Sequence, residues 1–217
     1  MQENPTRIPA DDGQIFLEGL FHEGTASRNA VLCHPHPLYG GNMDNNVVIA
    51  ARNAFAACGW GTLRFNFRGV GRSQGGPGQD ERAGEDLLAV ARHLHSQKPG
   101  APLDIAGYSY GAWAALKAIR NGLDPDLLCL FSPPLDFMSF EGLALPDIPI
   151  LITLGNQDDF CSVESLRKWL SGQAKSRVTL EIFPYCDHFY WEFGNELRSR
   201  ITAFLTKDCP QCPGQPG

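Results

Sequence analysis

The chain has 217 residues, of which 43% are hydrophobic and 19% charged, and its net charge at neutral pH is −6. This length suits one domain that buries a large core. An acidic chain without a basic stripe argues against nucleic acid and anionic membranes as partners, and no apolar run approaches the ~20 residues that span a bilayer.

The first residues of the chain and its cysteines indicate in which cellular compartment the protein is expected. Residues 1–5 lack the basic and apolar segments of a signal peptide. Five of the seven cysteines are scattered through apolar segments, which is typical of reduced thiols rather than of a disulfide framework. We therefore expect a cytoplasmic protein. The sequence leaves its oligomeric state open.

The pattern along the chain opens with a β-hairpin and then alternates between strands and helices. The hairpin covers residues 6–10 and 14–22, joined by the turn signal Asp11-Asp12-Gly13. Further strands are expected over residues 30–33, 60–67, 102–106, 127–131, 148–154 and 178–183, and helices over residues 43–58, 81–97, 112–119, 162–171 and 190–205. This alternation predicts an α/β fold, with a mostly parallel central sheet covered by helices on both faces.

No linker, repeat or second core interrupts this pattern. We assign residues 1–206 to a single domain, and residues 207–217, which are rich in proline and glycine, to a flexible tail. In open α/β sheets, ligands bind beyond the carboxyl ends of the strands. Candidate functional residues should therefore lie directly after strands.

Two segments match the pattern G-x-S-x-G, which places a serine on a sharp strand-to-helix turn in serine hydrolases. Gly107-Tyr108-Ser109-Tyr110-Gly111 lies between an expected strand and an expected helix. Gly71-Arg72-Ser73-Gln74-Gly75 is followed by Gly76-Pro77-Gly78, a loop composition that cannot begin a helix at once. The context selects Ser109 as the candidate nucleophile and makes Ser73 a loop residue.

A serine nucleophile needs a histidine to accept its proton and a carboxylate to orient that histidine. Where the serine lies on such a turn, the chain order is serine, acid, histidine, and His188 is the histidine that follows the turn. Asp158 or Asp159, directly after an expected strand, is the favoured acid. The weaker candidates are Asp187 and Asp136.

The same chemistry needs two backbone N–H groups that stabilise an oxyanion. Tyr110, directly after the nucleophile, should supply one. The other should come from His34-Pro35-His36-Pro37-Leu38-Tyr39-Gly40-Gly41, which follows the strand at residues 30–33. Because proline has no N–H, Leu38 and Tyr39 are the candidates in this loop.

Two other motifs have alternative interpretations. His34-Pro35-His36 offers two metal ligands, but no further ligands follow at a familiar spacing. Cys209-Pro210-Gln211-Cys212 resembles half of a zinc site or a redox pair, yet the chain has no second cysteine pair of this kind. We therefore expect neither a metal nor an organic cofactor.

Together these motifs resemble the α/β-hydrolase superfamily, and more narrowly its small, lidless esterase-like members with a His-Pro-His-Pro-x-x-Gly-Gly loop, related to dienelactone hydrolase. The resemblance covers residues 29–205. It implies Ser109 as nucleophile, His188 as base, Asp158 as acid and Leu38 as the second oxyanion donor. Dienelactone hydrolases use a cysteine nucleophile, so the serine here argues against lactone specificity.

The expected activity is hydrolysis of small carboxylic esters through an acyl-enzyme intermediate. A thioesterase or peptidase with the same residues is the alternative among enzymes, because the pocket rather than the fold selects the leaving group. A binding module on a hydrolase fold is the alternative from another class. The 16 residues from Ser132 to Asp147 are too few for a helical cap domain.

Overall fold

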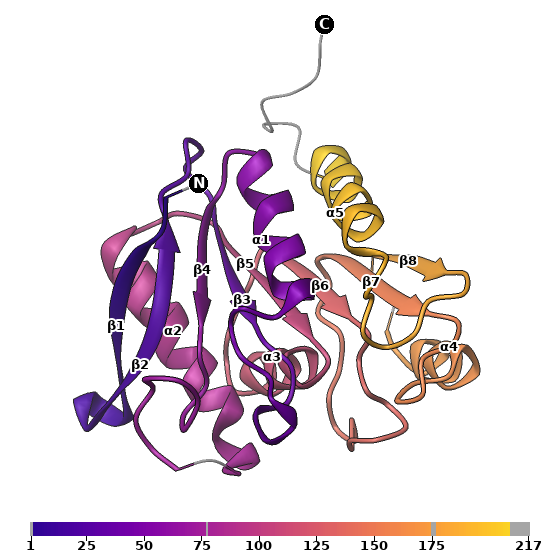
Figure 1. The fold of residues 1–217 in the computed structure, drawn as a ribbon, viewed down its shortest axis with the longest axis horizontal. Coiled ribbons are helices and arrows are strands. Elements are labelled where there is room, and N and C mark those ends of the chain that lie inside the picture. Colours follow the sequence, from indigo (N-terminus) through magenta and orange to yellow (C-terminus); the bar gives the residue numbers. More distant parts are fainter. Residues whose placement is uncertain (1, 77, 175–176, 209–217) are drawn as a thin grey trace, which may run out of the picture.

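The computed structural model describes residues 2–76, 78–174 and 177–208, and strands and helices alternate along it as predicted (Figure 1). The strands are β1 (Asn4–Ala10), β2 (Ile15–His22), β3 (Asn29–Cys33), β4 (Gly61–Phe65), β5 (Leu103–Tyr108), β6 (Leu127–Phe131), β7 (Pro149–Gly155) and β8 (Arg177–Phe183). The helices are α1 (Asn46–Ala57), α2 (Ala83–Gln97), α3 (Tyr110–Arg120), α4 (Val163–Ser171) and α5 (Gly194–Asp208). Short 3₁₀ helices cover Asp11–Gly13, Pro37–Tyr39 and Asp80–Arg82.

The described strands form one eight-stranded sheet in the order β1-β2-β4-β3-β5-β6-β7-β8. β1 and β2 form the predicted hairpin, and β2 also pairs antiparallel with β4. Every other neighbouring pair is parallel. The carboxyl ends of β3, β5, β7 and β8 therefore lie along the same edge, and the loops that follow them gather there.

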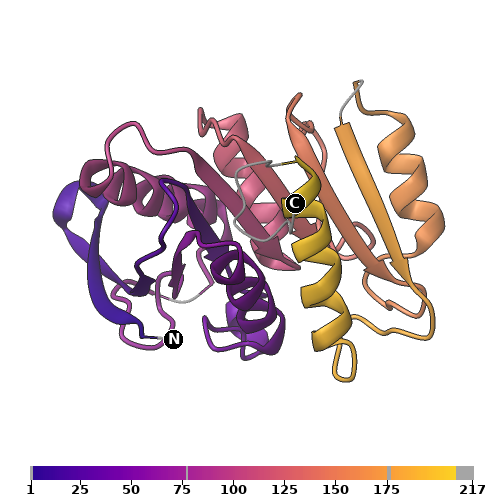
Figure 2. The same cartoon turned by 90° about the horizontal axis from the view of Figure 1, so that it is seen from above.

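Helices cover both faces of this sheet. In the view from above, α1 and α5 lie against one face, whereas α2, α3 and α4 lie against the other (Figure 2). The hydrophobic side chains divide accordingly into two clusters, one on each face. This arrangement is the α/β-hydrolase fold that the sequence predicts.

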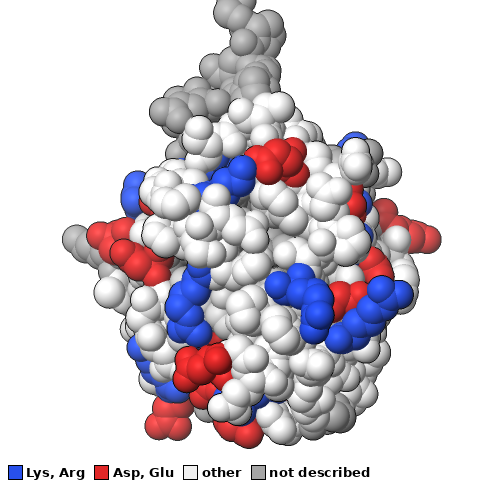
Figure 3. All heavy atoms as spheres, turned by 90° about the vertical axis from the view of Figure 1, so that its left-hand side faces the viewer, with Lys and Arg blue, Asp and Glu red and all other residues white. Residues whose placement is uncertain are grey.

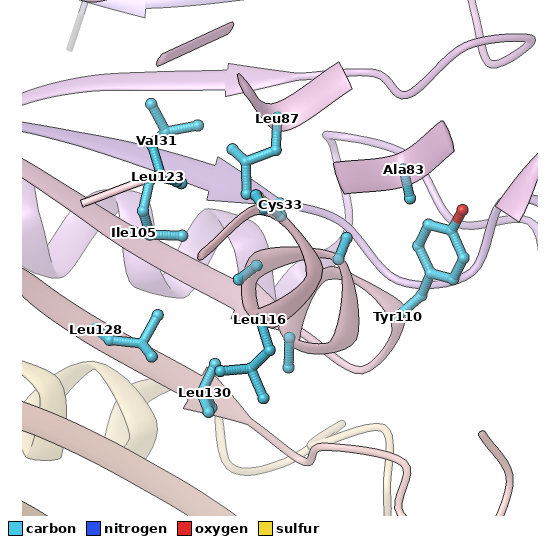
Figure 4. Close-up of a cluster of buried hydrophobic side chains, with 14 of the residues drawn as sticks. Val31, Cys33, Ala83, Leu87, Ile105, Tyr110, Leu116, Leu123, Leu128 and Leu130 are labelled. Atoms are coloured by element: carbon cyan, nitrogen blue, oxygen red, sulfur yellow. The ribbon is translucent and has the colours of Figure 1, made fainter. Parts of the chain in front are cut away.

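The central strands are buried from both sides, which explains their nearly continuous apolar sequences. Every residue of β3 and of β6 is buried. Figure 4 shows Val31, Ile105 and Leu128, from three neighbouring strands, in one cluster with Leu87 of α2 and Leu116 of α3. Each of these five side chains is fully buried. The turn between β5 and α3 thus adjoins fully buried parts of the core.

Two helices begin three or four residues later than their apolar pattern predicts. α1 begins at Asn46 rather than at residue 43, because the Asn45 side chain caps it by accepting a hydrogen bond from Val47 N at 2.9 Å. α5 begins at Gly194 rather than at residue 190. Tyr190 has a φ of 56°, which is incompatible with a helix.

The C-terminal end of α5 extends into the segment that the sequence predicts to be a flexible tail. The helix continues through Lys207 and Asp208, the first two of the residues that composition assigns to the tail. Residues 209–217, which include Cys209 and Cys212, lie outside the described residues. The interpretations of that cysteine pair stay predictions.

Charged residues of both signs share the surface. On the face at the β1 edge, acidic and basic side chains are interspersed rather than gathered into a patch of one sign (Figure 3). Charged side chains of the described residues form ion pairs, such as Arg82 with Asp11 and Arg64 with Glu3. Among the described residues, none of the helices has the length and apolar character needed to span a membrane.

Candidate active site

Ser109 lies on the predicted sharp turn, as the one residue between the end of β5 and the start of α3. Its φ of 53° and ψ of −114° are strained for a residue with a side chain. The flanking glycines are required by packing. A Cβ at Gly107 would lie 2.4 Å from the carbonyl oxygen of Gly111, and a Cβ at Gly111 would lie 2.4 Å from that of Cys33. The two glycines therefore let strand, helix and the end of β3 meet closely around Ser109.

The structure brings Ser109, His188 and Asp158 together from three separate loops at one edge of the sheet. His188 Nε2 lies 2.9 Å from Ser109 Oγ, and His188 Nδ1 lies 2.8 Å from Asp158 Oδ2. The residues are only 7%, 5% and 9% exposed, respectively. This geometry suits transfer of the serine proton to a histidine that a carboxylate orients.

Of the four carboxylates considered, Asp158 is the one that contacts His188. Its Oδ1 also accepts hydrogen bonds from the backbone N–H groups of Phe160, at 2.8 Å, and Cys161, at 3.1 Å. The neighbouring Asp159 is exposed.

The remaining two carboxylates stabilise loops. Hydrogen bonds from the Ser165 side chain and from Ser162 N, at the start of α4, hold the pKa of the Asp136 carboxyl below its usual value. Asp187 accepts hydrogen bonds from Phe189 N and Tyr190 N. Each thus has backbone partners of its own rather than the imidazole.

The backbone of His188 is held by a residue that sequence reasoning missed. Tyr108 Oη, from the end of β5, donates a hydrogen bond to the His188 carbonyl oxygen at 2.8 Å. Close by, Tyr190 Oη is hydrogen bonded to Ser132 Oγ at 3.0 Å and Thr153 Oγ1 at 2.9 Å. Tyr108 occupies a variable position of the G-x-S-x-G pattern, so no sequence signal singles it out.

The candidate oxyanion donors differ in whether their N–H groups are engaged. Tyr110 is the first residue of α3, so its N–H has no partner within the helix. Leu38 N donates to His36 Nδ1 at 3.2 Å, and Tyr39 N donates to the His36 carbonyl oxygen at 3.1 Å. Across the described part of the chain, no acceptor is recorded for the His36 N–H. The His36 ring lies 4.7 Å from that of Tyr110, measured between centroids.

The other histidine of the loop, His34, is fully buried and engaged through both ring nitrogens. Its Nε2 accepts a hydrogen bond from Phe67 N at 3.0 Å, so its Nδ1 carries the proton and donates to the Pro35 carbonyl oxygen at 2.6 Å. Burial lowers the pKa of His34 to about 4. A neutral imidazole with both nitrogens occupied fixes the loop and has no lone pair left for a metal. The described residues contain no group of three or more potential metal ligands.

Other candidate nucleophiles are engaged in the fold. Ser73 Oγ donates to the Asn66 carbonyl oxygen at 2.6 Å and accepts from Glu18 N at 2.9 Å, as expected of a loop residue. Burial raises the pKa of the thiols of Cys161 and Cys186 to about 12. Both cysteines are therefore protonated at neutral pH and are poor nucleophiles.

The sequence of the chain is similar to a family of proteins and to a protein of known sequence. The sequence model of the family described as serine aminopeptidase S33 matches residues 38–140. The chain is 32% identical over 201 residues to an uncharacterised protein of Rickettsia prowazekii, an alignment that covers 87% of this chain and 84% of that protein.

Solved structures extend the comparison to the whole fold. A serine α/β-hydrolase homologue from Coxiella burnetii is 30% identical, with a TM-score of 0.86 over 94% of this chain and 98% of that one. A lidless serine α/β hydrolase from Xanthomonas campestris is 27% identical, with a TM-score of 0.88 over 100% of this chain and 98% of that one. The chain belongs to the serine hydrolases of the α/β-hydrolase superfamily.

Proposed function

We propose that the protein is a carboxylic ester hydrolase in which Ser109, His188 and Asp158 form a catalytic triad. The observation that carries this proposal is the continuous contact from Ser109 Oγ through the imidazole to the carboxylate, at 2.9 Å and 2.8 Å. The Asp158 carboxylate, which accepts from His188 Nδ1, leaves Nε2 without a proton and so able to accept one from Ser109.

The reaction proceeds through an acyl-enzyme. Ser109 Oγ attacks the ester carbonyl carbon while His188 Nε2 takes the hydroxyl proton. The tetrahedral intermediate collapses when the imidazolium gives this proton to the alcohol oxygen, which leaves with the electrons of the broken C–O bond. Water, deprotonated by the same nitrogen, then attacks the acyl carbon. The bond from this carbon to Ser109 Oγ breaks, the imidazolium returns its proton to Oγ, and the acid is released.

Two backbone N–H groups stabilise the oxyanion, and Tyr110 supplies the first. For the second, Leu38 would have to give up its hydrogen bond to His36 Nδ1. The N–H of His36 has no hydrogen-bond acceptor among the described residues, so it is free without such a rearrangement, and we propose His36 beside Leu38 as a donor. His36 has a φ of −57°, which a proline tolerates, so His36→Pro removes the N–H while His36→Ala retains it. Loss of an oxyanion donor lowers kcat by ~10²–10³.

Esterases with the same fold support the choice of substrate. An esterase of Pyrococcus furiosus shares the fold with a TM-score of 0.77 at 16% identity. Est1E of Butyrivibrio proteoclasticus, solved with bound ferulic acid, does so with a TM-score of 0.78 at 17% identity. In the present chain, residues 132–148 form turns and bends rather than helices, which leaves the serine side of the molecule uncapped. An uncapped site suits small esters.

Covalent labelling and a substrate panel test the proposal. A fluorophosphonate probe should label the folded protein at Ser109 and should not label the Ser109→Ala variant. The panel compares acetate and butyrate esters with the matching thioesters and with peptide amides. Faster cleavage of peptides would favour the aminopeptidase activity in the description of the matched family, and an inert Ser109 would favour a binding module.

A further inference from the structure

A group of aromatic side chains extends outward from His188, and several of them are exposed. We call Tyr39, Phe137, Phe160, Phe189 and Trp191 the aromatic arc. Phe137 and Phe189 are 50% and 45% exposed, and Tyr39 and Trp191 are 73% and 72% exposed. Large rings left in water at one place in a folded protein mark a surface that binds an apolar partner or ligand.

The rings of the arc form a continuous chain of contacts. The centroids of Tyr39 and Phe137 lie 6.0 Å apart, those of Phe137 and Phe160 5.4 Å, and those of Phe160 and Phe189 6.4 Å. Trp191 stacks on Phe189 at 6.3 Å. The segments that carry these rings come from four loops, so the fold rather than the local sequence assembles the arc.

Two rings of the aromatic arc contact His188, and this contact indicates which ligand the arc binds. The centroid of Phe160 lies 4.5 Å from that of His188, and the centroid of Phe189 lies 5.6 Å from it. The rings of Phe160 and Phe189 stand at 85° to each other. Anything that covers these two rings therefore lies beside the imidazole. A substrate of Ser109 fits that position, whereas a distant docking partner has no reason to end there.

The chemistry of the reaction decides which half of an ester lies there. His188 Nε2 gives its proton to the alcohol oxygen as the C–O bond breaks, so the alcohol half must lie against the imidazole. The oxyanion lies instead at the N-terminus of α3, beside Tyr110. Phe160 and Phe189 are rings that contact the imidazole which protonates the alcohol oxygen.

From this placement, and resting on the proposed ester hydrolysis, we propose that the protein selects esters of aromatic alcohols. The two rings near His188 stand at 85° to each other, so a planar ring that stacks on one of them meets the other edge to face. Aromatic pairs in offset or edge-to-face geometry are more favourable than the area they bury accounts for. A saturated ring of similar size buries a comparable area but lacks this interaction.

Matched substrates test the proposal. Benzyl acetate and cyclohexylmethyl acetate share the acyl group and have alcohols of similar size, and each kcat/KM is divided by the rate constant of hydroxide-catalysed hydrolysis of the same ester. We expect the corrected kcat/KM to be about twofold to tenfold higher for the benzyl ester. Methyl phenylacetate and methyl cyclohexylacetate carry the aromatic and the saturated ring in the acyl half instead. For this pair we expect a ratio of corrected kcat/KM values near one.

Substitutions assign the selectivity to the arc. Phe160→Leu and Phe189→Leu should each bring the benzyl ratio closer to one. The backbone N–H of Phe160 that binds Asp158 is retained in the first. Tyr185→Leu is the matched control, since Tyr185 is 80% exposed in the same loop as His188 and lies outside the ring contacts. It should retain the ratio of the wild-type protein. Thermal melts establish that each variant is folded.

The outcomes separate this inference from the function on which it rests. Ester hydrolysis with a benzyl ratio of one, an unchanged ratio in both leucine variants, or a larger preference on the acyl half would overturn the aromatic alcohol site alone. Absence of hydrolysis for every ester, together with an unlabelled Ser109, would overturn the proposed function and this inference with it.

Discussion

Replacement of Asp158 by asparagine tests the orientation of His188 most directly. Asp158 Oδ1 is held by the N–H groups of Phe160 and Cys161, so the asparagine oxygen should occupy that position. The new NH₂ group then lies where Oδ2 was, 2.8 Å from His188 Nδ1, and the oxygen at the Oδ1 position, 2.9 Å from this nitrogen, is the one acceptor of the side chain left beside it. Because the NH₂ group donates, it competes with this oxygen for Nδ1 and shifts the imidazole toward the tautomer with the proton on Nε2, a nitrogen that then cannot accept the proton of Ser109.

We expect Asp158→Asn to lower kcat by about 10⁴ while the protein stays folded, the size of effect seen when such an acid becomes an amide. Asp159→Asn is the matched control. The Asp159 side chain is exposed, so this substitution should change kcat little. The assay is hydrolysis of p-nitrophenyl acetate, with a thermal melt of each variant. Equal losses in the two variants, or a fully active Asp158→Asn, would refute the assigned roles.

Three further predictions concern the nucleophile, the buried histidine and the acyl chain. Ser109→Ala should lower the turnover of p-nitrophenyl acetate by about 10⁴–10⁶, whereas Ser73→Ala should keep most of it; the reverse order would exclude the assigned nucleophile. Burial lowers the pKa of His34 from 6.5 to about 4, so the unfolded chain takes up this proton at higher pH than the native protein. The free energy of unfolding should therefore fall by about 2 kcal/mol between pH 7 and pH 5 through this residue, and urea titrations should show a shallower dependence in His34→Gln; identical slopes would contradict the assignment. An uncapped site buries few methylenes, each worth about 0.8 kcal/mol, so acetate and butyrate esters should be hydrolysed with higher kcat/KM than laurate and palmitate esters, and the opposite order would indicate a long acyl tunnel.

The order and type of the elements follow from sequence because each depends on local pattern. Alternating apolar segments and the turn signals between them predict the parallel sheet, its hairpin and the turn that carries Ser109. The start of a helix depends on finer interactions. At α5, the N–H groups of Phe189 and Tyr190 bind the Asp187 carboxylate, and this turn delays a helix whose apolar pattern begins earlier.

The residues of the candidate site also differ in how far the sequence alone predicts them. Ser109 and His188 are predictable because chain order and strand ends restrict the choice to one residue each. Asp158 and Asp159 remain equivalent by those rules, since adjacent side chains on a turn point in different directions and the turn geometry decides which one faces the imidazole. The resemblance selects Asp158, and the structure places that side chain against His188.

Contacts between distant segments are what sequence cannot supply. Tyr108 binds the backbone of His188, 80 residues away, and Phe160 and Phe189 meet only because their loops follow neighbouring strands. The engaged N–H of Leu38 is a further example. Its hydrogen bond to His36 depends on the path of the loop, which its prolines and glycines restrict but do not define.

The sheet explains how three loops hold one reactive geometry. His188 is fixed twice, through its side chain by Asp158 after β7 and through its carbonyl oxygen by Tyr108 at the end of β5. β5 and β7 flank β6 in the sheet, and β6 is buried along its whole length. The distance between the two anchors is therefore set by strand pairing rather than by the loop that carries the histidine. Ser109 directly follows Tyr108 in sequence, so a shift of the imidazole away from the serine would have to break one of these two contacts.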